Sequence, residues 1–355
     1  MMKLLPFSLA FAGSLLADEV TVRNAEELRT ALHELKPGTT LRIAPGDYPG
    51  GHHVTSTERL TIEALDPKSP PHFKGGSNAW HFSRCNNLSL RNLRISGQTG
   101  NGLNLDDGGD LASPTTGITL QNIEVSDIGP KGNHDGIKCS GLDKLTIRNC
   151  TLNGWGGQGI DFVGCHHSLI TECRFLGKEG FSATAGIQLK GGTSDVVVEK
   201  CRFTNAGARP INLGGSTGLA YFRPQGAPHE AARLIVRNNI IEGSECAAAF
   251  VGVDGAEFVE NTILHPAKWI FRILQETREP GFIPCRNVLI RGNRIVFRRS
   301  DVGTELNIGP GTEPETFRFE NNRWFAEDQP SASEPALPVQ EKDGHYGVDP
   351  RAGSR

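Results

Sequence analysis

The sequence contains no long basic tract, and none of its apolar runs is long enough to cross a membrane. Its formal net charge is −3, with 37 basic and 40 acidic residues mixed along the chain. Nucleic-acid-binding domains usually carry a basic patch or stripe, so the composition argues against nucleic acid as a partner. Methionine is scarce, with two residues, whereas glycine is abundant, with 43. This balance favours a turn-rich β architecture.

The N-terminus has the features of a secretory signal peptide. In MMKLLPFSLAFAGSLLA, Lys3 gives a positive start, an apolar run follows, and small residues end the segment. Cleavage after Ala12 or Ala17 fits this pattern. The run is too short to be a membrane anchor. We therefore expect residues 1–17 to be removed and the mature protein to be secreted or periplasmic, without a membrane span.

Two short segment types recur along the rest of the chain. The first type has equivalent positions 22 to 38 residues apart, at Leu93, Ile123, Cys150, Cys173, Cys201, Asn239, Asn261, Asn293 and Asn322. The second type includes GIKCSG (136–141), IQLKGG (187–192) and LNIGPG (306–311). It begins 10 to 14 residues later in each unit, at the anchors Leu103, Ile137, Ile160, Ile187, Ile211, Ala249, Phe271 and Leu306.

A unit of this length that repeats with a nearly constant internal offset predicts a right-handed parallel β-helix. A single coil cannot bury its own apolar face, so coils stack about 4.8 Å apart and equivalent residues form ladders. We predict an all-β, single-domain protein of about nine coils over residues 18–325. A β-sandwich is the alternative, but its strands need not keep a fixed offset.

Both ends of this domain are marked in the sequence. Residues 24–35 read as an amphipathic helix, with Asn24 as the N-cap and Glu27 three residues later. Such a helix would cap the first coil. The tail 326–355 loses the repeat, so it either wraps the last coil or hangs free.

Eight cysteines in an exported chain raise the question of disulfides. Cys150, Cys173 and Cys201 occupy one repeat position on adjacent coils, and in-register neighbours suit disulfide geometry poorly. No CxxC pair supports a zinc site. We expect most of the cysteines to be small, buried free thiols.

The residue after each anchor should point outward and form a column across the coils. This column is Asn104, Lys138, Asp161, Gln188, Asn212, Phe250, Arg272 and Asn307. Glycine precedes the anchor in four successive coils, which would leave backbone uncovered for a ligand. Insertions at 106–117, 214–232 and 275–285 would wall the stripe, and a groove of this kind suits an extended polymer. The alternative is that any outward sheet face is polar.

Single residues of the stripe carry more specific expectations. Lys138 and Asp161 should be cross-coil neighbours, and a salt bridge is the simplest role for them. Lys190 is flanked by Val163 and Gly214 and has no carboxylate in its column, so it could act as a base or be a solvated lysine. Asp135 is a candidate for acid–base chemistry.

Substrate contacts are expected from Asn104, Gln188, Asn212 and Arg272 in the column. The 214–232 insertion adds Tyr221 and Arg223 to these. Asp106, Asp107 and Asp110, in LDDGGD, offer hard oxygen ligands for calcium, although a polar turn is the commoner meaning of such a run.

The stretch TVRNAEELRTALHELKPGTTLRIAPGDYPG, with its helix and PGDY strand, resembles the start of secreted β-helix polysaccharide lyases of the alginate lyase and chondroitinase B-like group. The resemblance implies β-elimination on an acidic, uronate-containing polysaccharide. In that group a strand lysine removes a proton, and an arginine or calcium neutralises the uronate. Lys190 looks like this lysine. The arginine expected one coil later would stand at Gly214, and Arg209 and Arg223 are only near it in sequence.

Three functions are therefore open for a protein expected to be a monomer. The leading one is a polysaccharide lyase. A glycoside hydrolase on the same fold could use carboxylates such as Asp135 and Asp161. A non-catalytic glycan-binding or surface protein is the third, because fold alone does not decide function.

Overall fold

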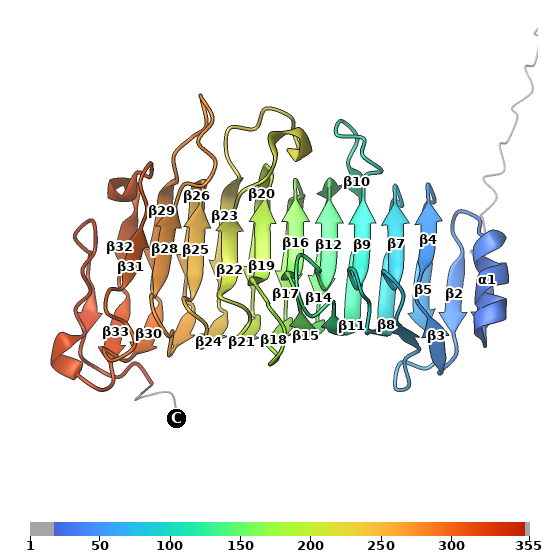
Figure 1. The fold of residues 1–355 in the computed structure, drawn as a ribbon, viewed down its shortest axis with the longest axis horizontal. Helices are drawn as coiled ribbons and strands as arrows, with labels where there is room; N and C mark the ends of the chain where they lie inside the picture. Colours follow the sequence, from blue (N-terminus) through green and yellow to red (C-terminus); the bar gives the residue numbers. More distant parts are fainter. Residues whose placement is uncertain (1–17, 352–355) are drawn as a thin grey trace, which may run out of the picture.

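The computed structural model describes residues 18–351, and it shows an elongated stack of parallel coils (Figure 1). The predicted signal peptide lies outside the described residues, as do the last four residues of the tail. Helix α1 (Ala25–His33) lies at one end of the stack and the C-terminal segment at the other. The predicted all-β helical architecture is confirmed, including its single capping helix among the described residues.

One sheet of ten parallel strands, counted within residues 18–351, forms a long flat face of the molecule. Its strands follow each other along the stack in chain order: β4 (His52–Thr55), β7 (Trp80–Ser83), β9 (Leu103–Asp106), β12 (Ile137–Ser140), β16 (Gln158–Val163), β19 (Ala185–Lys190), β22 (Arg209–Gly214), β25 (Ala248–Val251), β28 (Phe271–Leu274) and β31 (Leu306–Ile308). The ladder positions that predicted about nine coils start at Leu93, and β4 and β7 precede them.

The other strands form two parallel series that share the long strands β8 (Ser89–Ser96) and β11 (Thr119–Ile128). The first series also contains β1 (Glu19–Val22), β2 (Thr40–Ile43), β5 (Thr61–Ala64), β14 (Thr146–Arg148), β17 (His166–Thr171), β20 (Thr193–Glu199), β23 (Ala231–Arg237), β26 (Val253–Val259), β29 (Arg286–Arg291) and β32 (Arg318–Glu320). The second contains β3 (Asp47–Pro49), β6 (His72–Lys74), β15 (Thr151–Trp155), β18 (Arg174–Leu176), β21 (Arg202–Thr204), β24 (Ile240–Glu242), β27 (Thr262–Leu264), β30 (Arg294–Phe297), β33 (Arg323–Ala326) and β34 (His345–Tyr346).

Short elements occupy the connections between these strands. They are β10 (Thr115–Thr116), β13 (Leu142–Asp143), η1 (Leu219–Tyr221), η2 (Pro314–Thr316) and η3 (Pro330–Ala332). Three long loops, at 107–114, 215–230 and 275–285, extend beyond the same end of the ten-stranded sheet, at the top of Figure 1. They follow β9, β22 and β28, as the predicted insertions do.

Alternation along each strand of the ten-stranded sheet places one set of side chains in the core and the other outside. The anchors pair in register, for example Ile137 with Ile160 and Ile187 with Ile211. The predicted anchor Ala249 is wrong by one residue, because Ala248 pairs with Ile211. Phe250 therefore lies fully buried in the core and not in the outward column. A run of three alanines gives no alternation signal, and burial of the large Phe250 ring fixes the register.

The inward ladders of cysteine and asparagine are confirmed. Cys150, Cys173 and Cys201 lie on consecutive coils, because the strand residues on both sides of them pair in register. In the asparagine ladder, Asn239 donates both its backbone N–H and its Nδ2 to Asn261 Oδ1, at 3.0 Å each. Asn261 repeats this pattern with Asn293. Each buried amide is thus satisfied by the next coil.

Both ends of the stack are covered. Asn24 Oδ1 accepts hydrogen bonds from the backbone N–H groups of Glu26 and Glu27, so the predicted N-cap is confirmed. At the other end the tail covers the ladder, since Glu341 Oε1 accepts from the backbone N–H and Nδ2 of Asn322. Glu341 Oε2 accepts from Trp324 Nε1 at 2.9 Å. The tail therefore closes the last coil.

The asparagine ladder gives a stability prediction. Asn261→Ala should leave both donors of Asn239 and the carbonyl of Val236 without their partner. Because each buried unsatisfied group costs about 1–3 kcal/mol, we expect unfolding free energy to fall by about 2 to 4 kcal/mol. Urea unfolding measures this change. The exposed Asn133→Ala is the control and should stay within about 0.5 kcal/mol of wild type. Equal losses in both variants would contradict the ladder's role.

The cysteines give a chemical prediction. All eight are buried free thiols in the structure, so a thiol reagent should react with none of them in the native protein. After denaturation without reductant, all eight should react. Finding fewer reactive thiols in the denatured protein would show disulfides and contradict this arrangement.

Candidate functional site

One row of outward side chains crosses the whole ten-stranded sheet. The strand register places its members side by side, in the order His53, His81, Asn104, Lys138, Asp161, Gln188, Asn212, Ala249, Arg272 and Asn307. We call this set the outward row. The repeat pattern predicted it from Asn104 onward, with Ala249 replacing Phe250. The row is polar at nine of its ten positions, but Asp161, Gln188 and Asn212 are buried within it.

Four charged residues meet at the centre of the row, and we call them the charged centre: Asp135, Lys138, Asp161 and Lys190. Lys138 Nζ forms an ion pair with Asp161 Oδ2 and lies 3.4 Å from Asp135 Oδ2. Lys190 Nζ lies 3.4 Å from Asp161 Oδ1. The prediction that Lys190 has no neighbouring carboxylate is therefore wrong. Lys190 pairs with Val163, two residues beyond Asp161, and a long side chain can reach such a diagonal neighbour.

Burial divides the charged centre into two layers. The side chains of Asp135 and Asp161 are 1% and 0% exposed, whereas those of Lys138 and Lys190 are 21% and 15% exposed. The carboxylates thus form a floor and the ammonium groups lie above it. A ligand on this face touches positive charge first.

The same burial controls protonation in the charged centre. Burial, and then the neighbouring Asp161 carboxylate, raises the pKa of Asp135 to about 6. For Lys138, burial alone would lower the pKa, but the Asp161 and Asp135 carboxylates outweigh it and raise the pKa above its usual value. Lys138 is therefore a cation at neutral pH, and Asp135 can take up a proton as the pH falls toward 6.

Polar backbone and amide groups fix the floor in place. Asp135 Oδ1 accepts a hydrogen bond from the backbone N–H of Gln158 at 2.8 Å. Gln188 Nε2 donates to the carbonyl of Gly214 at 3.4 Å. Among the described residues, Asp161 Oδ1 and Asn212 Oδ1 accept no hydrogen bond although both atoms are buried. Within the described chain, the ion pair with Lys190 is therefore the polar contact of Asp161 Oδ1.

The glycine column has a structural role that differs from the predicted one. A Cβ at Gly136 would lie 2.6 Å from the carbonyl oxygen of Gly159, and a Cβ at Gly159 would lie 2.6 Å from that of Gly186. Such contacts are too close for any side chain. Glycine is needed there because the backbone of the next coil passes too close for a side chain. The position is therefore not an open surface for a ligand.

A buried ion pair connects two of the loops at the top of the sheet. Arg223, on the 215–230 loop, donates Nη2–H to Asp107 Oδ1 at 2.9 Å, and its Nε donates to Asp107 Oδ2. The side chain crosses above Gly164, where a Cβ would lie 2.9 Å from Arg223 Cδ. Glu230, fully buried, accepts from the backbone N–H of Gly191 at 2.9 Å. These contacts hold the loop against the end of β19, next to Lys190.

This arrangement places several predicted site residues away from the charged centre. Arg223 is 9% exposed and is bound to Asp107, whereas Tyr221, on the same loop, is 65% exposed. Arg209, at the start of β22, lies 3.5 Å from Glu276 Oε1. Arg272 belongs to the outward row, where its Nε–H donates to Asn307 Oδ1 at 2.9 Å.

The three candidate calcium ligands have separate partners. Asp106 Oδ2 accepts from His81 Nε2 at 2.6 Å, and Asp107 binds Arg223. Asp110 accepts from the backbone N–H of Ala112 at 3.1 Å and so stabilises a turn. Within residues 18–351, no cluster of three His, Cys, Asp or Glu side chains is arranged to hold a metal ion.

The sequence did not reveal every polar group of this face. His53 and His81 begin the outward row, with rings stacked at 4.4 Å, and they lie in a cavity of about 520 Å³ that Asp106 also lines. They were missed because they precede Leu93, the first position at which the repeat can be recognised in the sequence. Gln158 was missed because it lies two positions before the inward anchor Ile160, where alternation predicts another inward residue.

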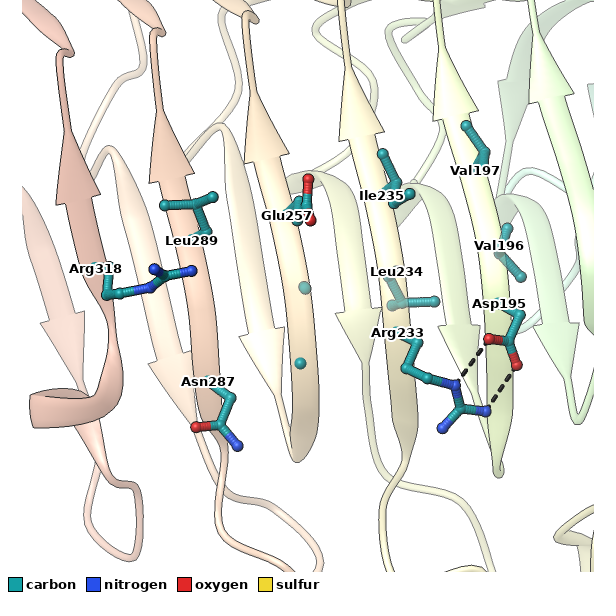
Figure 2. A pocket seen from close by; sticks show the side chains of 12 residues that line it. Asp195, Val196, Val197, Arg233, Leu234, Ile235, Glu257, Asn287, Leu289 and Arg318 are labelled. Atoms are coloured by element: carbon teal, nitrogen blue, oxygen red, sulfur yellow. Dashed lines mark hydrogen bonds and ion pairs between the residues drawn. The ribbon is translucent and has the colours of Figure 1, made fainter.

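A second cavity of about 520 Å³ lies on the opposite side of the coils, on the strands β20, β23, β26, β29 and β32 (Figure 2). Its walls include the aliphatic side chains of Val197 and Ile235, on the neighbouring strands β20 and β23, and of Leu289 on β29. Glu257, on β26, lies between Ile235 and Leu289. The clearest charged contact of the cavity is Arg233 with Asp195, and this hydrogen bond lowers the pKa of Asp195 to about 2. A carboxylate held in its charged form by an arginine offers no proton to exchange near neutral pH.

The stacked coils and inward ladders define the class of parallel β-helix proteins. The sequence matches the family model for the right-handed β-helix region over residues 79–263. This match covers more than half of the chain, which therefore belongs to the right-handed β-helix family. No curated protein matches the sequence.

Solved structures show the same fold at low identity. An alginate lyase from Paenibacillus sp. str. FPU-7 superimposes with a TM-score of 0.55 at 18% identity, over 82% of this chain and 98% of that chain. A GH136 lacto-N-biosidase from Eubacterium ramulus gives 0.59 at 11% identity, over 93% and 68%. A mannuronic-acid-specific family 6 polysaccharide lyase from human gut microbiota gives 0.54 at 12% identity, over 90% and 89%. These likenesses establish the fold alone.

Within residues 18–351, no helix combines the length and the apolar character needed to cross a membrane.

The raised pKa of Asp135 predicts a change in how stability depends on pH. Its pKa is about 6 in the folded protein and about 4 in an unfolded chain. The folded state thus binds a proton that the unfolded state releases between these values. This group should stabilise the wild type by about 1 to 3 kcal/mol as the pH falls from about 7 to about 4. Asp135→Asn, which cannot titrate, should lack this gain in thermal unfolding.

The control for this experiment is Asp195→Asn on the opposite face. The pKa of Asp195 is lowered, so its stabilisation is present above about pH 4 and is lost only as the pH falls toward 2. The two variants should therefore differ from wild type in separate pH ranges. Parallel curves for wild type and Asp135→Asn would contradict the raised pKa.

Proposed function

We propose that this protein is a carbohydrate-active enzyme that cleaves an acidic, uronate-containing polysaccharide by β-elimination at the charged centre. One observation carries this proposal. The accessible charges at the middle of the outward row are the ammonium groups of Lys138 and Lys190, and both carboxylates lie beneath them. A surface with this layering attracts an anionic polymer, and a polar row of this length fits an extended chain.

The two lysines take different roles in the proposed reaction. Lys138 contacts both buried carboxylates and stays protonated, so it neutralises the uronate carboxylate of the substrate. This position supplies the positive charge that the sequence lacks at Gly214, where the resemblance to β-helix lyases places an arginine. Stabilising the negative charge that grows during proton removal is the largest expected contribution to such a reaction.

Lys190 is the proposed base. Its ammonium group lies 3.4 Å from Asp161 Oδ1, a buried oxygen that accepts no hydrogen bond. Lys190 releases a proton to water, and the neutral amine then removes the proton from the carbon next to the uronate carboxylate. The electrons of that C–H bond form a double bond to the adjacent ring carbon. The glycosidic C–O bond breaks, and the leaving oxygen takes a proton from water.

Hydrolysis is the second candidate, and the Asp135–Asp161 pair favours it. Glycoside hydrolases usually act with a pair of carboxyl groups, and one of this pair, Asp135, has a raised pKa near 6. Both side chains are almost completely covered, however, and direct attack on a sugar requires contact. The layering therefore favours the lysine chemistry.

The products distinguish these functions. Elimination creates a carbon–carbon double bond conjugated with a carboxylate, which absorbs ultraviolet light, and hydrolysis creates reducing ends without that absorbance. We expect the ultraviolet signal when the mature protein is mixed with a panel of uronate polymers. Reducing ends alone would replace the lyase proposal with the hydrolase. Retention on a glycan column without either product would leave a binding protein.

A charge-conserving substitution can test whether Lys190 acts as the base or only binds substrate through its positive charge. Lys190→Arg keeps a cation but has no proton that it can release near neutral pH. We expect this variant to lower kcat by about 10²- to 10⁴-fold with little change in KM, and Lys190→Met to raise KM as well. The exposed Lys68→Met is the control. Unchanged kcat in Lys190→Arg would show that Lys190 binds substrate without acting as the base.

A further inference from the structure

The end of the outward row near β28 holds an arginine without an acidic partner. Among residues 18–351, no carboxylate lies within ion-pair distance of Arg272, whose Nε–H donates to the neutral Asn307 Oδ1 at 2.9 Å. Its guanidinium carbon lies 4.7 Å from the centre of the Trp269 ring. A half-buried cation that is held in place by neutral groups keeps its charge available for a ligand.

A second arginine adds to the positive charge at this place. Arg209 lies on β22, two strands before β28, and its partner Glu276 is a partly exposed residue of the 275–285 loop. Burial, and then the nearby Arg209, lower the pKa of Arg272. Two guanidinium groups that repel each other are stabilised when an anion binds between or beside them.

Only uncharged side chains of the outward row lie between this pair and the charged centre. The register aligns Asn212, Ala249 and Arg272 on the neighbouring strands β22, β25 and β28. Ala249 carries only a methyl group, and the buried Asn212 Oδ1 accepts no hydrogen bond within the described chain. Ala249 and Asn212 are almost fully covered, so no charged side chain of the row competes with Arg272 for an anion between it and the charged centre.

We propose that Arg272, positioned by Trp269 and assisted by Arg209, is a second subsite that binds the carboxylate or sulfate group of an acidic sugar unit. The polymer then lies along the β-helix axis, with one acidic unit at the charged centre and another at Arg272. This inference rests on the proposed function, because it assigns a second position on the same polymer. A guanidinium fork recognises planar oxyanions in two-point contact, which a lysine cannot reproduce.

The spacing of the strands makes the subsite depend on substrate length. Lys190 lies on β19 and Arg272 on β28, three strand steps apart. At about 4.8 Å per step, the two groups are separated by about 14 Å along the axis. A disaccharide at the charged centre cannot reach Arg272, whereas a longer oligosaccharide can.

The test compares wild type and Arg272→Gln on uronate oligosaccharides from disaccharide to octasaccharide. We expect KM of the variant to rise about 10- to 100-fold for the long substrates, as for a lost charge-assisted hydrogen bond, while kcat stays unchanged. Kinetics on the shortest cleaved substrate should not change. Arg272→Lys should recover only part of the loss. Arg202→Gln, at an exposed arginine on β21, is the matched control.

Direct titration with a long polyuronate and a sulfated glycan separates this inference from the proposed function. If the wild type cleaves uronates and Arg272→Gln has wild-type KM at every length, the subsite is overturned and the lyase proposal stands. If the wild type binds a sulfated glycan in an Arg272-dependent way but cleaves no uronate, the subsite stands as a sulfate site and the lysine chemistry is overturned. Binding of neither glycan overturns both.

Discussion

The parallel hydrogen bonding between successive coils is the constraint on which the rest of this molecule depends. In-register strands place equivalent residues about 4.8 Å apart, so each position in the repeat becomes a ladder. Inward ladders must be apolar or must satisfy their own polar groups, as the asparagines from Asn239 to Asn322 do. Outward ladders escape this demand, and they are where polar side chains can gather in a straight row.

The same stacking explains the chemistry of the charged centre. Neighbouring coils bring Lys138 and Asp161 side by side, and Asp135 lies three residues before Lys138 on the same coil. Lysines and loops then cover the carboxylates, which lose contact with water and become costly to keep charged without the ammonium groups above them. The buried carboxylates thus hold the lysines in place, and the ammonium groups offset the free-energy cost of burying the carboxylate charges. Under the proposed function, the same set of contacts would provide both substrate attraction and local stability.

The loops form a wall at one end of the ten-stranded sheet. Arg223 reaches from the 215–230 loop to Asp107 on the 107–114 loop, across coils that glycines at 141 and 164 leave open. Glu230 fastens the base of the same loop next to Lys190. Buried, bidentate contacts of this kind hold a loop far more firmly than exposed ion pairs do. The wall above the charged centre is therefore part of the folded frame.

Sequence periodicity by itself determined the coil, the inward ladders, the capping helix and most of the outward row, because the spacing of apolar residues encodes which residues stack. It could not fix the register at Ala248, where three alanines give no alternation, or find His53 and His81, which precede the legible repeat. Only the tertiary structure decided that Lys190 reaches Asp161 and that Arg223 binds Asp107. Those contacts depend on the reach of long side chains and on loop paths, which local spacing does not encode.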